Sequence, residues 1–185
     1  LPIFETPGTE DGVSETLDPQ LLEIFRQEAR SHLDTLDSFL RRATATETPV
    51  ISDALQRALH TLKGSAYMAG VVPIAELASP LDQLVREFKA NLIPLGAAEI
   101  QLLRAAEPLF NQGLMQLGSE PLATIPGADH YIADVLELLQ QRLKTALSAP
   151  NSGLRLKRNP QLIASFLAQG MDILRSEERR VGKEC

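Results

Sequence analysis

The sequence is poor in aromatic residues and cysteine, and it lacks long apolar runs. Aromatic residues make up 4% of the 185 residues and tryptophan is absent, a composition that favours leucine- and alanine-rich helices packed on helices. The single cysteine is the last residue, Cys185, so it cannot form an intramolecular disulfide, as is typical of cytoplasmic proteins. Without an apolar run of about eighteen residues or a signal-peptide pattern, we expect no membrane span and a cytoplasmic location.

Basic clusters and metal-binding patterns are also missing. The formal net charge is −6 and no basic block occurs, which argues against nucleic acid as a partner. The three histidines, His32, His60 and His130, lie far apart in the sequence, and no Cys, His, Asp or Glu cluster has metal-ligand spacing. There is no glycine-rich nucleotide loop of either common kind. We therefore expect no metal, no cofactor and no ATP site in this fragment.

Apolar residues recur with helical spacing in five stretches, about 19–42, 53–69, 73–91, 97–117 and 130–148. Four helices joined by short turns favour an all-α, antiparallel up-down-up-down four-helix bundle. The fifth is expected as an additional C-terminal helix packed alongside. For the last two helices the pattern predicts these core residues: Ile100, Leu103, Leu109 or Phe110, Leu114, Ile132, Val135, Leu136, Leu139, Leu143 and Leu147.

The ends of the chain differ in character from its middle. Residues 1–17 mix proline, glycine and acids without periodicity and are expected to be a linker, in a chain cut from something longer. After the helical domain at 18–148 and a linker at 149–158, residues 159–174 repeat the Pro-Gln-Leu start of the first helix. We interpret them as the truncated start of a second, similar module. The charged tail 175–185 resembles a translated adapter oligonucleotide and is expected to be non-native.

The helix that contains His60 has two distinct faces. His60, Lys63, Gly64 and Tyr67, with Gln56 one turn earlier, are expected on the side that faces away from the core. Glycine costs roughly 1 kcal/mol relative to alanine inside a helix, but Gly64 opens space beside the imidazole. These features suit a nucleophile that another protein must reach; an ordinary surface histidine is the alternative. The core stripe of this helix is expected to comprise Leu55, Ala58, Leu59, Leu62, Ala66 and Ala69.

The next helix is expected to fold back on this one as an antiparallel hairpin. With the turn centred near residue 71, His60 lies level with Asp82, and Lys63 lies level with Ser79. A carboxylate beside the ring can accept a hydrogen bond from one ring nitrogen and leave the other as the nucleophile, although Asp82 can equally be an ordinary exposed acid. Pro80 should bend this helix near Ser79, either adjusting the carboxylate or without functional effect. His32, at the edge of the first helix's stripe, is interpreted as structural.

The residues His60-Thr-Leu-Lys63-Gly64-Ser65-Ala66 resemble the H-x-x-K-G-[SG]-[AS] signature of histidine phosphotransfer (HPt) domains, especially those of chemotaxis-like and twitching-motility-like hybrid histidine kinases. The resemblance covers about residues 18–148. It implies that His60 accepts and donates a phosphoryl group, that Lys63 assists, and that Gly64 gives the partner room. Chemotaxis-type domains usually carry glutamate where this chain has Asp82 and often a second histidine in place of Ser79, which leaves the activation of His60 open.

The resemblance implies a module of a two-component phosphorelay. A histidine kinase catalytic domain would phosphorylate His60, and the aspartate of a response-regulator receiver domain would take the group. The candidate catalytic residues are His60, Lys63 and Asp82. The candidate partner-binding residues are Gln56, Gly64, Tyr67 and Ser79. The fragment is then no enzyme by itself, and its parent chain is expected to be a histidine kinase; the alternative is an HPt-like scaffold that docks partners without phosphotransfer.

Overall fold

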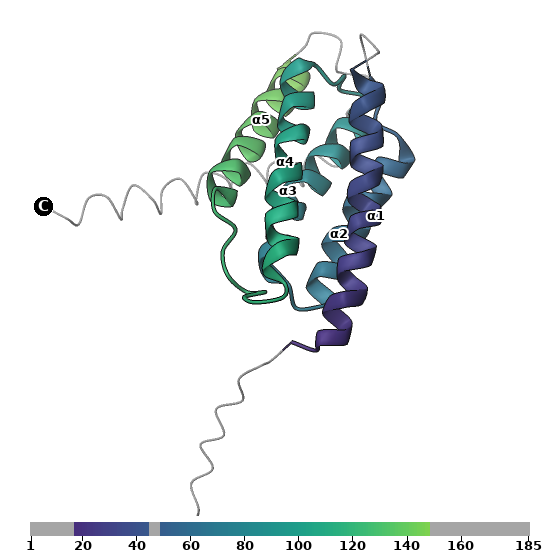
Figure 1. The fold of residues 1–185 in the computed structure, drawn as a ribbon. Helices are drawn as coiled ribbons and strands as arrows, with labels where there is room; N and C mark the ends of the chain where they lie inside the picture. Colours follow the sequence, from purple (N-terminus) through teal and green to yellow (C-terminus); the bar gives the residue numbers. More distant parts are fainter. Residues whose placement is uncertain (1–16, 45–48, 149–185) are drawn as a thin grey trace, which may run out of the picture.

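A computed structural model gives the fold and describes residues 17–44 and 49–148. Within these ranges the protein is all-α, with five helices and no strand, which confirms the predicted fold class (Figure 1). Each helix begins and ends within two residues of its expected bounds. The helices are α1 Pro19–Ala43, α2 Asp53–Met68, α3 Val72–Ala90, α4 Ala97–Gln116 and α5 Ala128–Ser148.

Several predictions concern segments outside the described residues. They are the N-terminal linker up to residue 16, the linker at 149–158, the second module at 159–174 and the non-native tail at 175–185. These interpretations therefore stay predictions. Among the described helices, none combines the length and the apolar character needed to cross a membrane.

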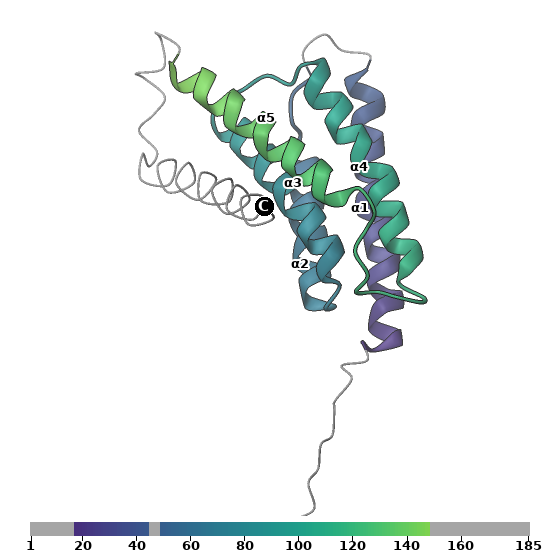
Figure 2. The ribbon, with the colours of Figure 1, turned by 90° about the vertical axis from the view of Figure 1, so that its left-hand side faces the viewer.

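The first four helices form a closed ring of neighbours. Helix α2 packs against α1 and α3, and α4 completes the ring by packing against the same two helices. Helix α5 lies outside this bundle, where it contacts α3 and α4 and crosses them obliquely (Figure 2). The result is a four-helix bundle with an additional C-terminal helix.

Local signals in the sequence account for the helix ends. Asp18 caps α1 by accepting a hydrogen bond from the Gln20 N–H at 2.9 Å, with proline at the first helical position. Ser52 caps α2 by accepting a hydrogen bond from the Leu55 N–H at 3.1 Å.

The turn between α2 and α3 is closed by a Schellman motif. Gly70 has a φ of +74°, a left-handed conformation that glycine adopts without steric penalty. Its N–H donates to the Tyr67 carbonyl at 3.1 Å, and the Val71 N–H donates to the Ala66 carbonyl at 2.9 Å. This tight turn fixes how α3 is placed along α2, and hence which side chains of the two helices meet.

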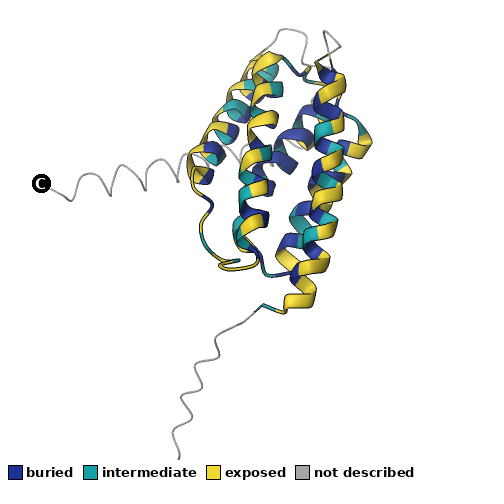
Figure 3. Cartoon of the chain, viewed as in Figure 1, coloured by how far each residue is buried: buried dark blue, intermediate teal, exposed yellow. Residues whose placement is uncertain are grey.

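The core runs along the inner faces of the bundle (Figure 3). The stripe predicted for α2 is buried, and three phenylalanines, Phe25, Phe88 and Phe110, are at most 2% exposed. Of the two alternatives on α4, Phe110 is buried in the core and Leu109 is half-buried. The prediction that Ile100 is a core residue was wrong, because its side chain is only half-buried. On α5 the buried predicted residues are Val135, Leu139 and Leu143, whereas Ile132, Leu136 and Leu147 are half-buried.

Two polar contacts attach α5 to α4. The Tyr131 hydroxyl of α5 donates to the Leu102 carbonyl of α4 at 2.8 Å. Arg142 Nε donates to Glu99 Oε1 at 2.5 Å, and the Gly96 N–H donates to the other carboxylate oxygen at 2.7 Å. Burial opposes the ionisation of Glu99, but the hydrogen bonds from Arg142 and the backbone outweigh burial and hold its pKa below the ordinary value. Glu99 therefore stays charged at the α4–α5 contact.

Replacing Arg142 should test how strongly this pair stabilises the docking of α5. We expect Arg142→Ala to lower the free energy of unfolding by about 2 kcal/mol, less than the roughly 3–5 kcal/mol for a fully buried pair, because Arg142 is 38% exposed. The pKa of Glu99 is lowered from 4.5 in the folded state. The contribution is therefore fully present above pH 4.5 and is lost as the pH falls through the lowered pKa.

Urea unfolding of wild type and variant at pH 7 and pH 3 measures this difference. Arg104→Ala is the matched control, because Arg104 is an exposed arginine on α4, and it should change stability by less than about 0.5 kcal/mol. An Arg142→Ala variant as stable as the Arg104→Ala control at pH 7 would contradict the proposed contribution.

Candidate functional site

His60 stands on the outer face of α2, clear of the core. Its side chain is 67% exposed, whereas Leu59 and Leu62, which flank it in sequence, are each 1% exposed. The helical period therefore places the imidazole in solvent while the neighbouring leucines anchor α2 in the bundle. A partner protein can reach this ring without any rearrangement of the fold.

A buried carboxylate lies directly behind the ring. Asp82 of α3 is 2% exposed, and its Oδ1 lies 3.4 Å from His60 Nδ1, so the predicted juxtaposition of His60 and Asp82 is present. This separation is longer than a typical hydrogen bond of 2.7–3.2 Å, and the contact is electrostatic. Because Nδ1 is turned towards Asp82, Nε2 is the ring nitrogen directed away from α3.

Lys63 is paired with the same carboxylate. Its Nζ donates a hydrogen bond to Asp82 Oδ2, and its side chain is only 22% exposed. The expectation that Lys63 points to solvent beside His60 was therefore wrong in this respect. The lysine leans from α2 onto α3 because a buried, ionised carboxylate needs a charged partner.

A second contact between α2 and α3 lies two turns away from the first. Lys89 Nζ binds Asp53 Oδ1 and also donates to Gln56 Oε1 at 3.0 Å. The hydrogen bond and positive charge of Lys89 lower the pKa of the Asp53 carboxyl. Gln56, predicted to bind a partner, is thus partly engaged within the domain.

Lys89 was not singled out from the sequence, although a signal for it exists. In an antiparallel pair the residue numbers at one level have a constant sum, and Asp53 with Lys89 gives the same sum, 142, as His60 with Asp82. The same constant sum of residue numbers, extended along the whole α2–α3 hairpin, therefore predicts the contact between Asp53 and Lys89.

The surface on the C-terminal side of His60 is open and partly apolar. A Cβ atom added to Gly64 would meet nothing within 4 Å, so the helix backbone is accessible one turn from the imidazole. Tyr67 is 51% exposed, and Met68, which was not among the predicted site residues, is 85% exposed. Exposed apolar side chains beside a functional group are typical of protein-docking surfaces.

The remaining predicted residue, Ser79, lies on α3 one turn before Asp82. It is half-buried, and among the described residues it makes no hydrogen bond with Lys63, whose ammonium group is on Asp82 instead. The next residue, Pro80, is buried inside α3 and has no N–H to donate to the Glu76 carbonyl. The structure therefore brings His60, Lys63 and Asp82 together and leaves Ser79 at their edge.

The other histidines belong to different surroundings. His32 of α1 lies 3.4 Å from Glu28 of the same helix and is half-buried, in line with a structural role. His130 is exposed in the first turn of α5. A groove of about 740 Å³ between the start of α1 and the segment after α4 is lined by residues such as Leu22, Arg26 and Leu117, none of which belongs to the His60 site.

Comparison with known families supplies one match. The family model described as Hpt domain matches residues 20–117, a range that begins at the second residue of α1, includes α2, α3 and α4, and ends before α5. A comparison with curated proteins gave no match.

Substituting Gly64 tests whether the surface of α2 beside His60 has room for an additional side chain. Since its added Cβ meets no atom, we expect Gly64→Ala to raise the free energy of unfolding by about 0.5–1 kcal/mol through helix propensity. Gly113 in α4 is the matched control, because its added Cβ would lie 2.7 Å from Ile125 Cδ1 and 3.0 Å from Ile74 Cγ1. Gly113→Ala should therefore lower stability by about 1–3 kcal/mol. Thermal unfolding distinguishes the two signs, and a destabilised Gly64→Ala would show that the site is less open than described.

Proposed function

Since this chain belongs to the Hpt domain family, we propose that His60 accepts a phosphoryl group and passes it to the aspartate of a receiver domain. Hpt domains are phosphotransfer modules of phosphorelays and carry no ATP site of their own. The observation that carries the assignment of His60 is an imidazole 67% exposed, with Nδ1 3.4 Å from a buried carboxylate and Nε2 directed outwards.

The tautomer required for this chemistry follows from the position of Asp82. A carboxylate beside Nδ1 favours the proton on that nitrogen, which leaves a lone pair on Nε2. The lone pair attacks phosphorus, the N–P bond forms, and the bond from phosphorus to the donor's oxygen breaks with its electron pair. The product ring carries a positive charge, which Asp82 stabilises. Transfer to an aspartate reverses these steps on a receiver carboxylate.

The neighbours of His60 take distinct roles in this proposal. Lys63 pairs with the Asp82 carboxylate and holds it in place behind the ring. Gly64 lets the partner's backbone approach the phosphorylated nitrogen, and Tyr67 with Met68 offers apolar surface to the partner. Gln56 and Ser79 lie at the edge of the same surface. Transfer then depends on positioning and electrostatics, so a small exposed site on a rigid bundle is adequate.

The wider context is also a proposal. A histidine kinase catalytic domain phosphorylates His60, and a receiver domain, which brings its own magnesium, takes the group. The module spans 18–148 because α5 is attached to α3 and α4. The parent chain would be a chemotaxis-like hybrid histidine kinase in the cytoplasm, with a second module starting near residue 159.

The competing function is a docking scaffold that has lost phosphotransfer. One observation favours it: the 3.4 Å separation between His60 Nδ1 and Asp82 Oδ1 is long for the hydrogen bond that activates a histidine. The intact arrangement of His60, Lys63 and Gly64 favours phosphotransfer, because a scaffold needs neither a nucleophile nor open backbone beside it.

Labelling with a cognate kinase and ATP tests the assignment directly. Wild-type protein should gain an acid-labile phosphoryl group that moves to a receiver domain, whereas His60→Gln should gain none. His60 is exposed, so this variant should keep its fold, which circular dichroism checks. Label that persists in His60→Gln would remove His60 from the mechanism. Receiver binding that is the same with and without phosphorylation, in the absence of any label, would favour the scaffold.

The role of Asp82 is tested by neutralising it. We expect Asp82→Asn to slow phosphorylation of His60 roughly tenfold or more, equivalent to about 1.4 kcal/mol or more in the barrier, because the amide does not favour a proton on Nδ1. Asp82→Glu, which keeps the charge, should retain more of the rate. Single-turnover labelling of folded protein gives these rates, and equal rates in wild type and Asp82→Asn would contradict the proposed activation.

A further inference from the structure

A phosphoryl group on His60 needs a positive charge, and in the resting site the ammonium group of Lys63 is already bound to Asp82. Such a group brings up to about two negative charges at neutral pH. Lys63 is the nearest lysine in sequence, but its ammonium group binds Asp82 and its side chain is only 22% exposed. Moving Lys63 to the phosphoryl group would leave the buried Asp82 with the ring of His60, 3.4 Å away, as its one remaining positive partner among the described residues, and a buried charge that loses its hydrogen-bonded partner is costly. Another cation is therefore needed on the outer surface.

Arg86 of α3 lies on the helical stripe that faces α2. Asp82, Arg86 and Lys89 are spaced i, i+4 and i+7, which places them within one narrow stripe of a helix. The two outer members of this stripe contact α2 through Lys63 and Asp53. Arg86 lies between these two contacts and is itself exposed. It therefore lies at the solvent-exposed edge, or rim, of the interface between α2 and α3, which we call the α2–α3 seam.

The register of the hairpin places Arg86 beside the turn of α2 that contains Gln56 and His60. The Asp53–Lys89 and His60–Asp82 pairs each have residue numbers that sum to 142, and the Gln56–Lys89 and Lys63–Asp82 pairs each sum to 145. The level of Arg86 on α2 is therefore residues 56–59. This is within one turn of His60, about 5.4 Å along the helix, and both His60 and Arg86 are exposed.

Arg86 is also free to act. Among the residues that the structure describes, it forms no ion pair, and the nearby acids on its stripe and opposite it are engaged elsewhere. Asp82 is bound by Lys63, and Asp53 is bound by Lys89. No competing interaction has to be broken before its guanidinium group turns towards the ring.

We propose that Arg86 is a phosphoryl-binding residue of this site, donating hydrogen bonds from its guanidinium group to the non-bridging oxygens of the group on His60 Nε2. This inference rests on the proposed function of His60. A guanidinium group suits the task because its planar fork binds two phosphoryl oxygens at once and stays charged throughout. The site then uses two cations for two anions: Lys63 for Asp82 in the seam, and Arg86 for the phosphoryl group at the rim.

The test uses phosphoramidate, a small donor that requires no cognate kinase. The His60 Nε2 lone pair forms a new N–P bond as the N–P bond of the donor breaks and ammonia leaves with a proton from solvent. The rate of labelling, followed by phosphorus NMR on the full chain, should fall about tenfold in Arg86→Ala. This is less than the roughly 100-fold or more typical of a preorganised donor in an enclosed site, because Arg86 is exposed.

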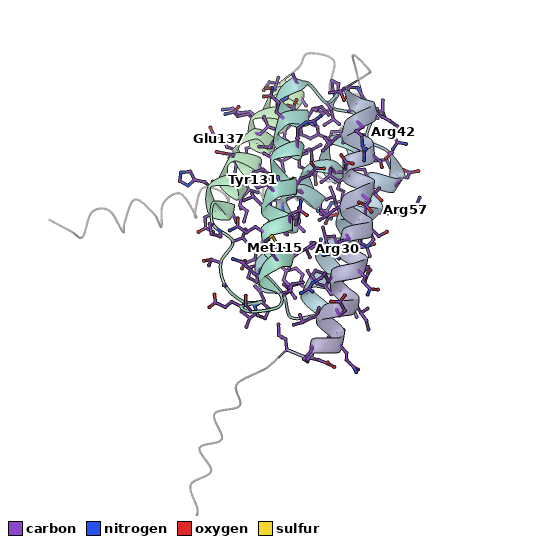
Figure 4. The ribbon with its side chains drawn as sticks, viewed as in Figure 1. Arg30, Arg42, Arg57, Met115, Tyr131 and Glu137 are labelled. Atoms are coloured by element: carbon purple, nitrogen blue, oxygen red, sulfur yellow. The ribbon has the colours of Figure 1, made fainter. Side chains whose placement is uncertain are left out.

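Further variants distinguish the effect of the positive charge on residue 86 from the effect of its position. Arg86→Lys should retain an intermediate rate because it keeps the charge without the fork, and Arg86→Glu should be slower than Arg86→Ala. Arg57 is the matched control: it is an exposed arginine three residues before His60 on α2, at the outer edge of the bundle (Figure 4). Arg57→Ala should change the rate less than twofold. Thermal unfolding should show all four variants to be folded, since both arginines are exposed.

The outcomes distinguish this inference from the proposed function. An Arg86→Ala variant that labels His60 at the wild-type rate would overturn the role of Arg86 and leave the role of His60 intact. Equal losses in Arg86→Ala and Arg57→Ala would also overturn it, because they would indicate a diffuse charge effect rather than a binding residue. Wild-type protein with no label on His60 would overturn the proposed function, and this inference with it.

Discussion

The charge of Asp82, buried between α2 and α3, is the constraint on which the site depends. An ionised carboxylate that is 2% exposed is stable only with a charged or hydrogen-bonding partner, and Lys63 supplies one from the opposite helix. A shift of α3 by one turn would separate this pair. The Schellman turn at Gly70 and the Lys89–Asp53 contact hold the same register from the two ends of α2. His60 is therefore placed by the same contacts that hold the hairpin together.

Much of this arrangement could be predicted from the sequence because it follows from helical periodicity. The burial of Leu55, Leu59 and Leu62, and the exposure of His60, depend only on about 100° of rotation per residue. The juxtaposition of His60 and Asp82 depends on one further assumption, a tight hairpin centred near residue 71, which Gly70 makes favourable. Both rules use backbone geometry, in which side-chain length and flexibility have no part.

The features that the sequence did not reveal depend on the direction in which long side chains turn. Lys63 is level with Ser79 by residue count, yet its four-carbon chain reaches Asp82, because the buried carboxylate attracts the ammonium group. Glu99 and Arg142 are 43 residues apart in sequence, and no periodicity predicts that α5 would cross α4 at that point. The choice of Phe110 over Leu109 similarly depends on how adjacent residues fill the space left by α3 and α5.

In the proposed phosphotransfer, the aspartate at position 82 explains why two cations are needed around one imidazole. Aspartate is one methylene shorter than the glutamate usual in chemotaxis-type domains, so its carboxylate stays in the seam, close to Lys63 and 3.4 Å from His60 Nδ1. A carboxylate at this depth stabilises the hairpin through Lys63 and orients the ring from behind, and it keeps the lysine from the surface. The positive charge for a phosphoryl group must then come from the rim, where α3 presents an exposed arginine between its two contacts with α2. The burial of the Asp82 carboxylate, which keeps Lys63 in the seam, thus determines that the positive charge for the phosphoryl group must lie at the rim.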